Sequence, residues 1–180
     1  MIIKMKKLVG VVALLCCQFF VNAQSGYKQA IGLRLTSHTT FDLISVSYKS
    51  FVSDHSALEF NLGYGGKNYI VPNTGGTTSY SPGYSVSGSY QYHELIETPS
   101  NENLHWFAGG GLNFFNISSK NKGYNGFGTG IFGTAGIDYK FKTSPVNVTA
   151  DWRPTIYLST PSAFLPIQIG TLGLAVRYTF

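Results

Sequence analysis

The chain has 180 residues, with 13 lysines and arginines against 8 acidic residues, and charged residues make up only 12% of it. It contains 21 glycines, 12 tyrosines and 13 phenylalanines, yet no apolar run approaches the roughly 20 residues that a transmembrane helix needs. The length fits one domain behind a short leader. Both cysteines, Cys16 and Cys17, fall in that leader, so disulfides and cysteine metal sites are excluded from the remainder.

The first 23 residues are predicted to be a cleaved signal peptide. Lys4, Lys6 and Lys7 precede the apolar run LVGVVALLCCQFFV, and small residues follow at Asn22 and Ala23. A basic start, a short apolar centre and small residues before the cut are typical of secretory leaders. Cleavage after Ala23 leaves residues 24–180 as a single barrel domain. An alternative is a lipoprotein acylated at one of the two cysteines, although small residues normally precede such a cysteine.

Removal of the leader takes three lysines away, so the mature chain carries ten basic and eight acidic residues. The basic pI of about 9.2 therefore belongs partly to the leader. A net charge near +2 gives weak support for nucleic-acid binding, and no nucleic-acid partner is expected.

Eight segments of the mature chain alternate apolar and polar residues with a period of two, as half-buried strands do. They are AIGLRLT (30–36), LISVSYKS (43–50), ALEFNLGYG (57–65), YSVSGSYQYH (84–93), a glycine-rich stretch from 104 to about 115, GIFGTAGIDYKF (130–141), VNVTADWRPTIY (146–157) and 171–180. Six of the eight reach the roughly 9–11 residues of a membrane-crossing strand, and the first two are slightly shorter as bounded here. No helix is predicted in the mature chain.

The connections between these segments differ in length. SDHS and KTSP are short turns, whereas residues 67–82 and 116–127 are predicted to be long polar loops. Short turns at one end and long loops at the other are typical of transmembrane β-barrels. The ten residues ELIETPSNEN, 94–103, depart from this pattern because they are long on the short-turn side. An even strand number places both ends of the barrel domain in the periplasm.

The polar face of the strands carries charges, which suits a narrow lumen better than a water-exposed surface. The predicted lumen charges are Arg34, Lys49, Glu59, Asp138, Lys140, Asp151, Arg153 and Arg177. Aromatic residues gather near strand ends, as interfacial girdles require; they are Tyr48, Phe51, Tyr92, Trp106, Tyr139, Phe141 and Trp152. The alternative is a soluble β-sandwich or lipocalin-like barrel, in which the apolar face would point inward.

The final strand ends on Tyr178, Thr179 and Phe180. Together with GLRLT, LEFNLGYGG, GIDYKF and VNVTADWRP, this ending resembles the small outer-membrane β-barrel family of Gram-negative bacteria, of the OmpA/OmpX type. The resemblance covers residues 26–180 and implies an eight-stranded antiparallel up-and-down barrel in the outer membrane. It also implies contact with membrane lipids and lipopolysaccharide. Tyr178 and Phe180 would then form the C-terminal signal that the barrel-assembly machinery reads.

No motif in the chain predicts a cofactor, a metal or catalysis. GTGIFG, residues 128–133, matches a dinucleotide fingerprint, but a strand pattern follows it where that site needs a helix. The four histidines, His38, His55, His93 and His105, show no metal-ligand spacing and are expected at the surface or rim. A lipid A-modifying enzyme would need a serine–histidine pair on the lipid-facing wall, where the candidate positions are aliphatic or aromatic.

The lumen charges therefore carry the functional prediction. The interior of an eight-stranded barrel is just wide enough for side chains to fill it, so buried charges there must be paired. Either the charges form a stable polar plug, or alternative pairings open a narrow path for small solutes or ions. A channel for a hydrophobic ligand also remains open. Tyr69, Tyr80, Tyr124 and Phe127, in or next to the predicted long loops, are candidate contacts for an unidentified extracellular partner or for lipopolysaccharide sugars.

Overall fold

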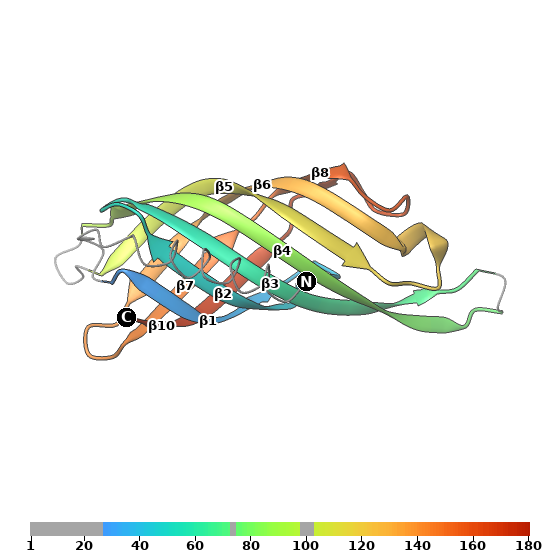
Figure 1. The fold of residues 1–180 in the computed structure, drawn as a ribbon, viewed down its shortest axis with the longest axis horizontal. Coiled ribbons are helices and arrows are strands. Elements are labelled where there is room, and N and C mark those ends of the chain that lie inside the picture. Colours follow the sequence, from blue (N-terminus) through green and yellow to red (C-terminus); the bar gives the residue numbers. More distant parts are fainter. Residues whose placement is uncertain (1–26, 73–74, 98–102) are drawn as a thin grey trace, which may run out of the picture.

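The computed structural model describes residues 27–72, 75–97 and 103–180, and the predicted signal peptide lies outside these residues. The described chain forms a closed antiparallel β-barrel (Figure 1). Its strands are β1 Gln29–Thr36, β2 Ile44–Phe51, β3 Ser56–Ile70, β4 Thr78–Leu95, β5 Leu104–Ile117, β6 Gly126–Lys140, β7 Val146–Trp152, β8 Thr155–Ser159, β9 Ile167–Gln168 and β10 Leu172–Thr179. No helix of the described residues is long and apolar enough to cross a membrane.

Consecutive strands from β1 to β7 pair with one another, β10 pairs with β7, and the first strand pairs with the last. β1 lies between β2 and β10, with Ile31 opposite Tyr178, and β5 pairs with β6 to complete the ring. β7 and β8 are two parts of one barrel strand, because β6 pairs with both of them. The break falls at Arg153 and Pro154, where proline supplies no backbone N–H to the ladder. The barrel therefore has eight antiparallel strands, as the alternation predicts.

We call the end at which β1 begins and β10 finishes the proximal end, and the opposite end the distal end (Figure 1). The proximal connections include the turns at residues 52–55 and 141–145. The distal connections are residues 37–43, 71–77, 118–125 and 160–166. The distal hairpin formed by β3 and β4 extends well beyond its neighbours.

The predicted loop at 67–82 is wrong for most of its length. β3 continues to Ile70 and β4 begins at Thr78, and the two remain paired residue by residue to that point. The prediction relied on the polar and glycine-rich composition of the segment, whereas a long hairpin satisfies its backbone hydrogen bonds whatever the side chains are. In the second predicted loop, 116–127, the connection itself spans 118–125 and includes a short 3-10 helix, Lys122–Tyr124. The distal connection at 160–166 lies between the last two predicted strand segments, 146–157 and 171–180.

Burial follows a period of two along most of the strands, with the polar side inward. Along β10, Leu174 and Val176 are exposed whereas Ala175 and Arg177 are buried. The close approach of β1 to β10 depends on Gly32, since a side chain there would meet the backbone of Val176 and Arg177. Residues 128–133 lie within β6, so the strand continues through the glycine motif, as predicted.

Candidate functional site

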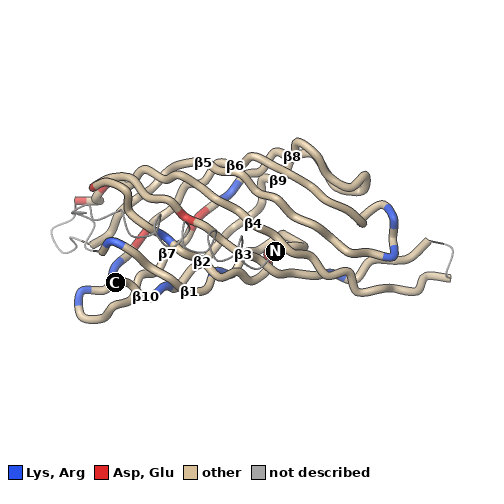
Figure 2. Tube along the Cα trace, viewed as in Figure 1, with Lys and Arg blue, Asp and Glu red and all other residues tan. Residues whose placement is uncertain are grey.

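The lumen is filled by charged side chains from six different strand segments. Arg34, Lys49, Glu59 and Arg177 are at most 1% exposed, and Asp138, Asp151 and Arg153 are nearly as buried. We call these seven residues the charge network. Figure 2 shows basic and acidic positions close together within the proximal half of the barrel. Charges this deeply buried are stable only when they are paired and hydrogen-bonded.

Glu59 lies at the centre of the charge network. Its carboxylate is 2.6 Å from the Arg153 guanidinium, 3.0 Å from that of Arg177 and 3.6 Å from the Lys49 ammonium. Asn61 and Gln91 also donate to it, at 3.2 and 3.1 Å. One carboxylate from β3 thus connects cations from three other parts of the barrel wall.

The other two carboxylates bind Arg34 and share Arg153 and Lys49 with Glu59. Asp151 accepts two hydrogen bonds from Arg34, one of them at 2.8 Å, and a further one from Arg153 at 3.0 Å. This bidentate arrangement is the strongest geometry for an arginine–carboxylate pair. Asp138 accepts from Lys49 and from the hydroxyl of Tyr27, both at 3.0 Å. The charge network therefore contains four cations and three carboxylates.

Lys140, the eighth predicted lumen residue, does not join this group. Its ammonium donates to the carbonyl oxygens of Phe141 and Ser144, both at 2.8 Å, in the proximal turn. Lys140 occupies an inward-facing position in the alternation of β6, but it is the last residue of that strand and can therefore reach the carbonyl oxygens of the turn. Strand alternation alone does not distinguish a lumen position from such a rim position.

His93 lies inside the barrel and not at its rim. It is 1% exposed, between the rings of Phe51 and Phe107 at centroid distances of 4.9 and 5.0 Å. Tyr27 packs edge-on against Phe51 at 5.1 Å. These four rings lie on the proximal side of the charge network. The burial of His93 could have been predicted, because it occupies an inward-facing position in the alternation of YSVSGSYQYH. No group of three potential metal-ligating His, Cys, Asp or Glu side chains occurs in the described part of the chain.

The distal side of the lumen is closed by residues 37–43, which we call the plug segment. This connection between β1 and β2 folds into the barrel mouth, where the Phe41 ring stacks on Phe115 at 4.0 Å and meets Tyr157 edge-on at 6.4 Å. Ile117 completes this buried distal cluster. Gly83 makes the approach possible, since a Cβ there would lie 2.8 Å from Cα of Phe41.

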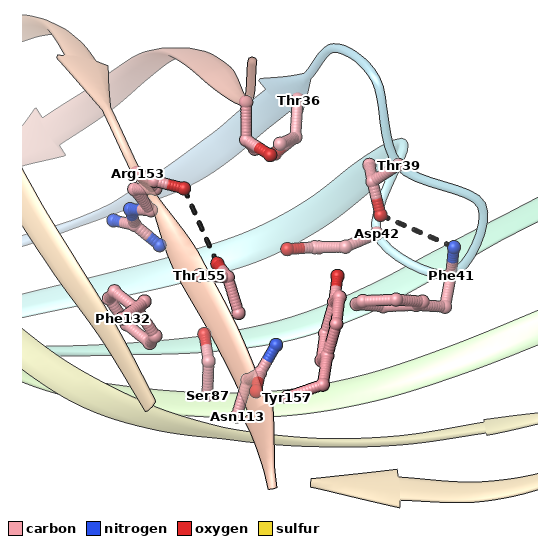
Figure 3. A pocket seen from close by; sticks show the side chains of 11 residues that line it. Thr36, Thr39, Phe41, Asp42, Ser87, Asn113, Phe132, Arg153, Thr155 and Tyr157 are labelled. Carbon is pink, nitrogen blue, oxygen red and sulfur yellow. Dashed lines mark hydrogen bonds between the residues drawn. The ribbon is translucent and has the colours of Figure 1, made fainter. Parts of the chain in front are cut away.

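A small polar cavity of about 30 Å³ separates the plug segment from the charge network. Figure 3 shows the Asp42 side chain pointing from the plug segment toward Thr155 and Arg153. Side-chain oxygens of Thr36, Asp42 and Asn113 are buried without a protein partner. A cavity of this size and polarity accommodates one or two water molecules, so it contains no room for an organic ligand.

Asp42 brings a fourth carboxylate to the four lumen cations. Burial raises the pKa of this carboxyl above its usual range, and the nearby positive charges of Arg34 and Arg153 oppose that rise. The plug segment thus contributes two side chains to the lumen. Phe41 packs in the distal mouth, and Asp42 points toward the charge network (Figure 3). Sequence reasoning missed both residues because they lie between the strands.

Large apolar side chains form a belt around the outside of the same barrel. Leu33, Leu62 and Val176 are 55, 62 and 51% exposed, whereas the inward neighbours Arg34 and Arg177 are at most 1% exposed. The exposed aliphatic and aromatic residues occur on all sides of the barrel; they include Leu35, Val46, Phe60, Val86, Leu112, Ile131, Ile137, Ile156, Leu172 and Leu174. An apolar outer band around a polar, closed interior is the arrangement that lipid requires.

The fold is that of a transmembrane β-barrel. The soluble sandwich or lipocalin-like alternative is wrong, since it places the apolar face inside. The fold implied by the resemblance to small outer-membrane barrels is confirmed, and it follows from the strand pairing and the belt of this chain itself.

Comparison with known proteins gives structural likeness only. No protein-family model matches the chain, and no curated protein matches it. Ail, the attachment invasion locus protein of Yersinia pestis, is 16% identical in sequence, with a TM-score of 0.44, and the match covers 84% of this chain and 96% of Ail. OmpT, an outer membrane protein of Vibrio cholerae, is 13% identical with a TM-score of 0.25, over 88% of this chain and 58% of OmpT.

Proposed function

We propose that this transmembrane barrel is an integral outer-membrane protein of a Gram-negative bacterium, with a closed lumen and no enzymatic activity. The charge network carries this proposal. Four cations and three carboxylates fill the interior in direct contact, between the ring layer around His93 and the plug segment. With the proximal end in the periplasm, the distal connections form the extracellular surface.

The experiment is single-channel recording with the refolded mature protein in a planar bilayer. We expect no conductance from protein whose folding has been checked by heat-modifiable gel migration. Reproducible small steps that change in Arg153→Gln would contradict the closed lumen. They would favour the second candidate, a narrow path for small solutes or ions. The observation behind that candidate is Glu59, which touches three cations and therefore has alternative partners.

An enzymatic role has one contact in its favour. Nδ1 of His38 lies 3.1 Å from Oγ of Ser37 at the distal end. The Ser37 hydroxyl, however, also bonds with the backbone of Leu172, and among the described residues no carboxylate contacts His38 to orient its ring. A nucleophile requires a base that a third group orients. We therefore propose a binding role for this surface; altered lipid A after expression of the protein, absent with Ser37→Ala, would contradict that proposal.

The exported location and the assembly route belong to the same proposal. Tyr178 and Phe180 are 58 and 60% exposed on the lipid-facing side of β10. This exposure is what a strand read by the barrel-assembly machinery needs before the barrel closes. On the extracellular side of this proposal, Tyr80 and Phe127 are more than half exposed and offer contacts to lipopolysaccharide or to an extracellular partner. The prediction of such a contact is wrong for Tyr69, because its ring is buried and stacks on Tyr124 at 3.7 Å.

A further inference from the structure

The barrel wall has a gap near its distal end. Pairing between β2 and β3 stops at Ile44 and Tyr64, although β3 continues to Ile70 with β4 alone beside it. Across the gap, β9 pairs only with β8. Two strand edges are therefore unpaired among the described strands, Gly65–Ile70 of β3 and Ile167–Gln168 of β9. The plug segment lies between these two edges.

A lateral cavity of about 530 Å³ occupies this gap. Phe41, Leu43 and Phe164 supply apolar lining, and Lys67, His38 and Gln168 supply polar lining. Its volume lies within the range of small-molecule sites, which combine apolar walls with a few polar groups. The lateral cavity is separate from the polar cavity beneath the plug segment, since Phe41 is the wall between them.

The lateral cavity lies at the level where the apolar belt meets water. Tyr64 and Tyr80, whose hydroxyls are 3.3 Å apart, flank it on the β3–β4 side. Tyrosine at this position is typical of the membrane interface. On the other side, exposed Ile167 and Ile169 extend the belt up to the gap. A molecule within the outer leaflet would therefore reach the lateral cavity from the side.

The charge around the lateral cavity is positive, and no acidic side chain of the described residues lines it. Lys67 is exposed, and its ammonium lies over the face of the Tyr69 ring, 6.0 Å from the centroid. Asp42 is the only acidic residue on the described distal segments, and it points inward to the lumen cations. Lys120 and Lys122 add to the positive charge of this end. An anionic head group is the complementary partner.

We propose that the lateral cavity binds a single-chain amphiphile with a carboxylate head, a long-chain fatty acid. The head lies at Lys67 on the interface, and the start of the chain contacts Phe41, Leu43 and Phe164. One chain suits a cavity of about 530 Å³ whose apolar lining comes from three side chains. The proposal rests on the membrane-spanning orientation given above, but not on whether the lumen conducts.

The test is equilibrium binding of radiolabelled palmitate to the mature barrel in zwitterionic phosphatidylcholine nanodiscs, with empty nanodiscs as the baseline. We expect saturable binding of one palmitate per barrel and about tenfold weaker binding of hexadecanol, which lacks the charge. Lys67→Gln is expected to weaken palmitate binding by a similar factor, and Lys67→Arg to retain it. Lys122→Gln, which removes a lysine outside the lateral cavity, is the matched control and leaves binding unchanged.

Three results would overturn the proposal: palmitate uptake no greater than in empty nanodiscs, equal binding of hexadecanol, or equal losses in Lys67→Gln and Lys122→Gln. Heat-modifiable migration of each variant separates lost binding from lost folding. Failure of the membrane-spanning orientation would appear earlier, as protein that does not enter nanodiscs. Conductance of the barrel would contradict the closed lumen and leave the palmitate result unaffected.

Discussion

At the scale of single residues, the charge network depends on a few carboxylates that each serve several cations. Glu59 is the extreme case, since it contacts Arg153, Arg177 and Lys49 at once. Removal of one partner from a buried ion pair leaves the others charged and unpaired, which costs more than the pair contributes. The interior charges are therefore a source of stability only as a complete set.

Glu59→Gln is expected to lower the free energy of unfolding by about 3 kcal/mol, because Arg177, Arg153 and Lys49 each lose a carboxylate partner. The measurement is urea unfolding of the barrel in phospholipid vesicles. Glu94→Gln is the control: the Glu94 side chain is 41% exposed and contacts His55 at 3.8 Å, so a change under about 1 kcal/mol is expected. Equal losses in both variants would show that the network is not a structural unit.

At the scale of elements, the plug segment determines whether the distal mouth is open or closed. It is held by aromatic packing of Phe41 and by the absence of a side chain at Gly83 and Gly65, where the plug backbone passes within about 3 Å of the Cβ positions. Connections of this kind, with few backbone hydrogen bonds to the strands around them, are the regions that open most readily.

Gly83→Ala is expected to displace the plug segment, because the new methyl group would lie 2.8 Å from the Phe41 backbone. Residues 24–180 contain no cysteine, so in protein that begins after the predicted signal peptide Asp42→Cys provides a unique thiol for a membrane-impermeant maleimide. Labelling should become about tenfold faster when Gly83→Ala is added, which corresponds to about 1.4 kcal/mol of easier opening.

The matched control for this labelling is Gly170→Ala, since nothing lies within 4 Å of a Cβ at Gly170. It should leave the rate of labelling at residue 42 unchanged. Fast labelling of Asp42→Cys without any glycine change would show that the plug segment does not occupy the mouth.

At the scale of the whole molecule, the barrel reverses the usual distribution of polarity. Side chains of Arg34 and Lys49 are completely buried, while Leu62 is 62% exposed. In water this arrangement would be unstable, but in a bilayer the exposed face is already solvated by lipid, and the closed ring pairs its strands with one another everywhere except at the distal gap.

Leu62→Arg is expected to destabilise the barrel in vesicles by about 2–4 kcal/mol, the cost of a cation on the lipid-facing wall near the midplane. Asn68→Arg is the control, since residue 68 is exposed on the same face of β3 beyond the interfacial tyrosines. A change below about 1 kcal/mol is expected there. If Leu62→Arg were as harmless as Asn68→Arg, the belt would not face lipid.

The sequence by itself determined the number of barrel strands and the direction in which most side chains point. Alternation is a local property of extended backbone, so Leu33 and Arg34 take opposite faces whatever else the chain does. For the same reason seven of the eight predicted lumen charges are buried inside the barrel. His93 likewise occupies an inward-facing position in the alternation of its strand.

Only the tertiary structure decided which charges meet and what closes the lumen. The contact of Glu59 with Arg153 joins residues 94 positions apart, and such contacts depend on strand register around the whole ring. Lys140 lies at a strand end, where the turn carbonyls compete for it. The polar composition of 67–82 gave no measure of how far β3 and β4 stay paired. The inward path of the plug segment follows from packing between Phe41, Phe115 and the glycines of neighbouring strands, which no local pattern encodes.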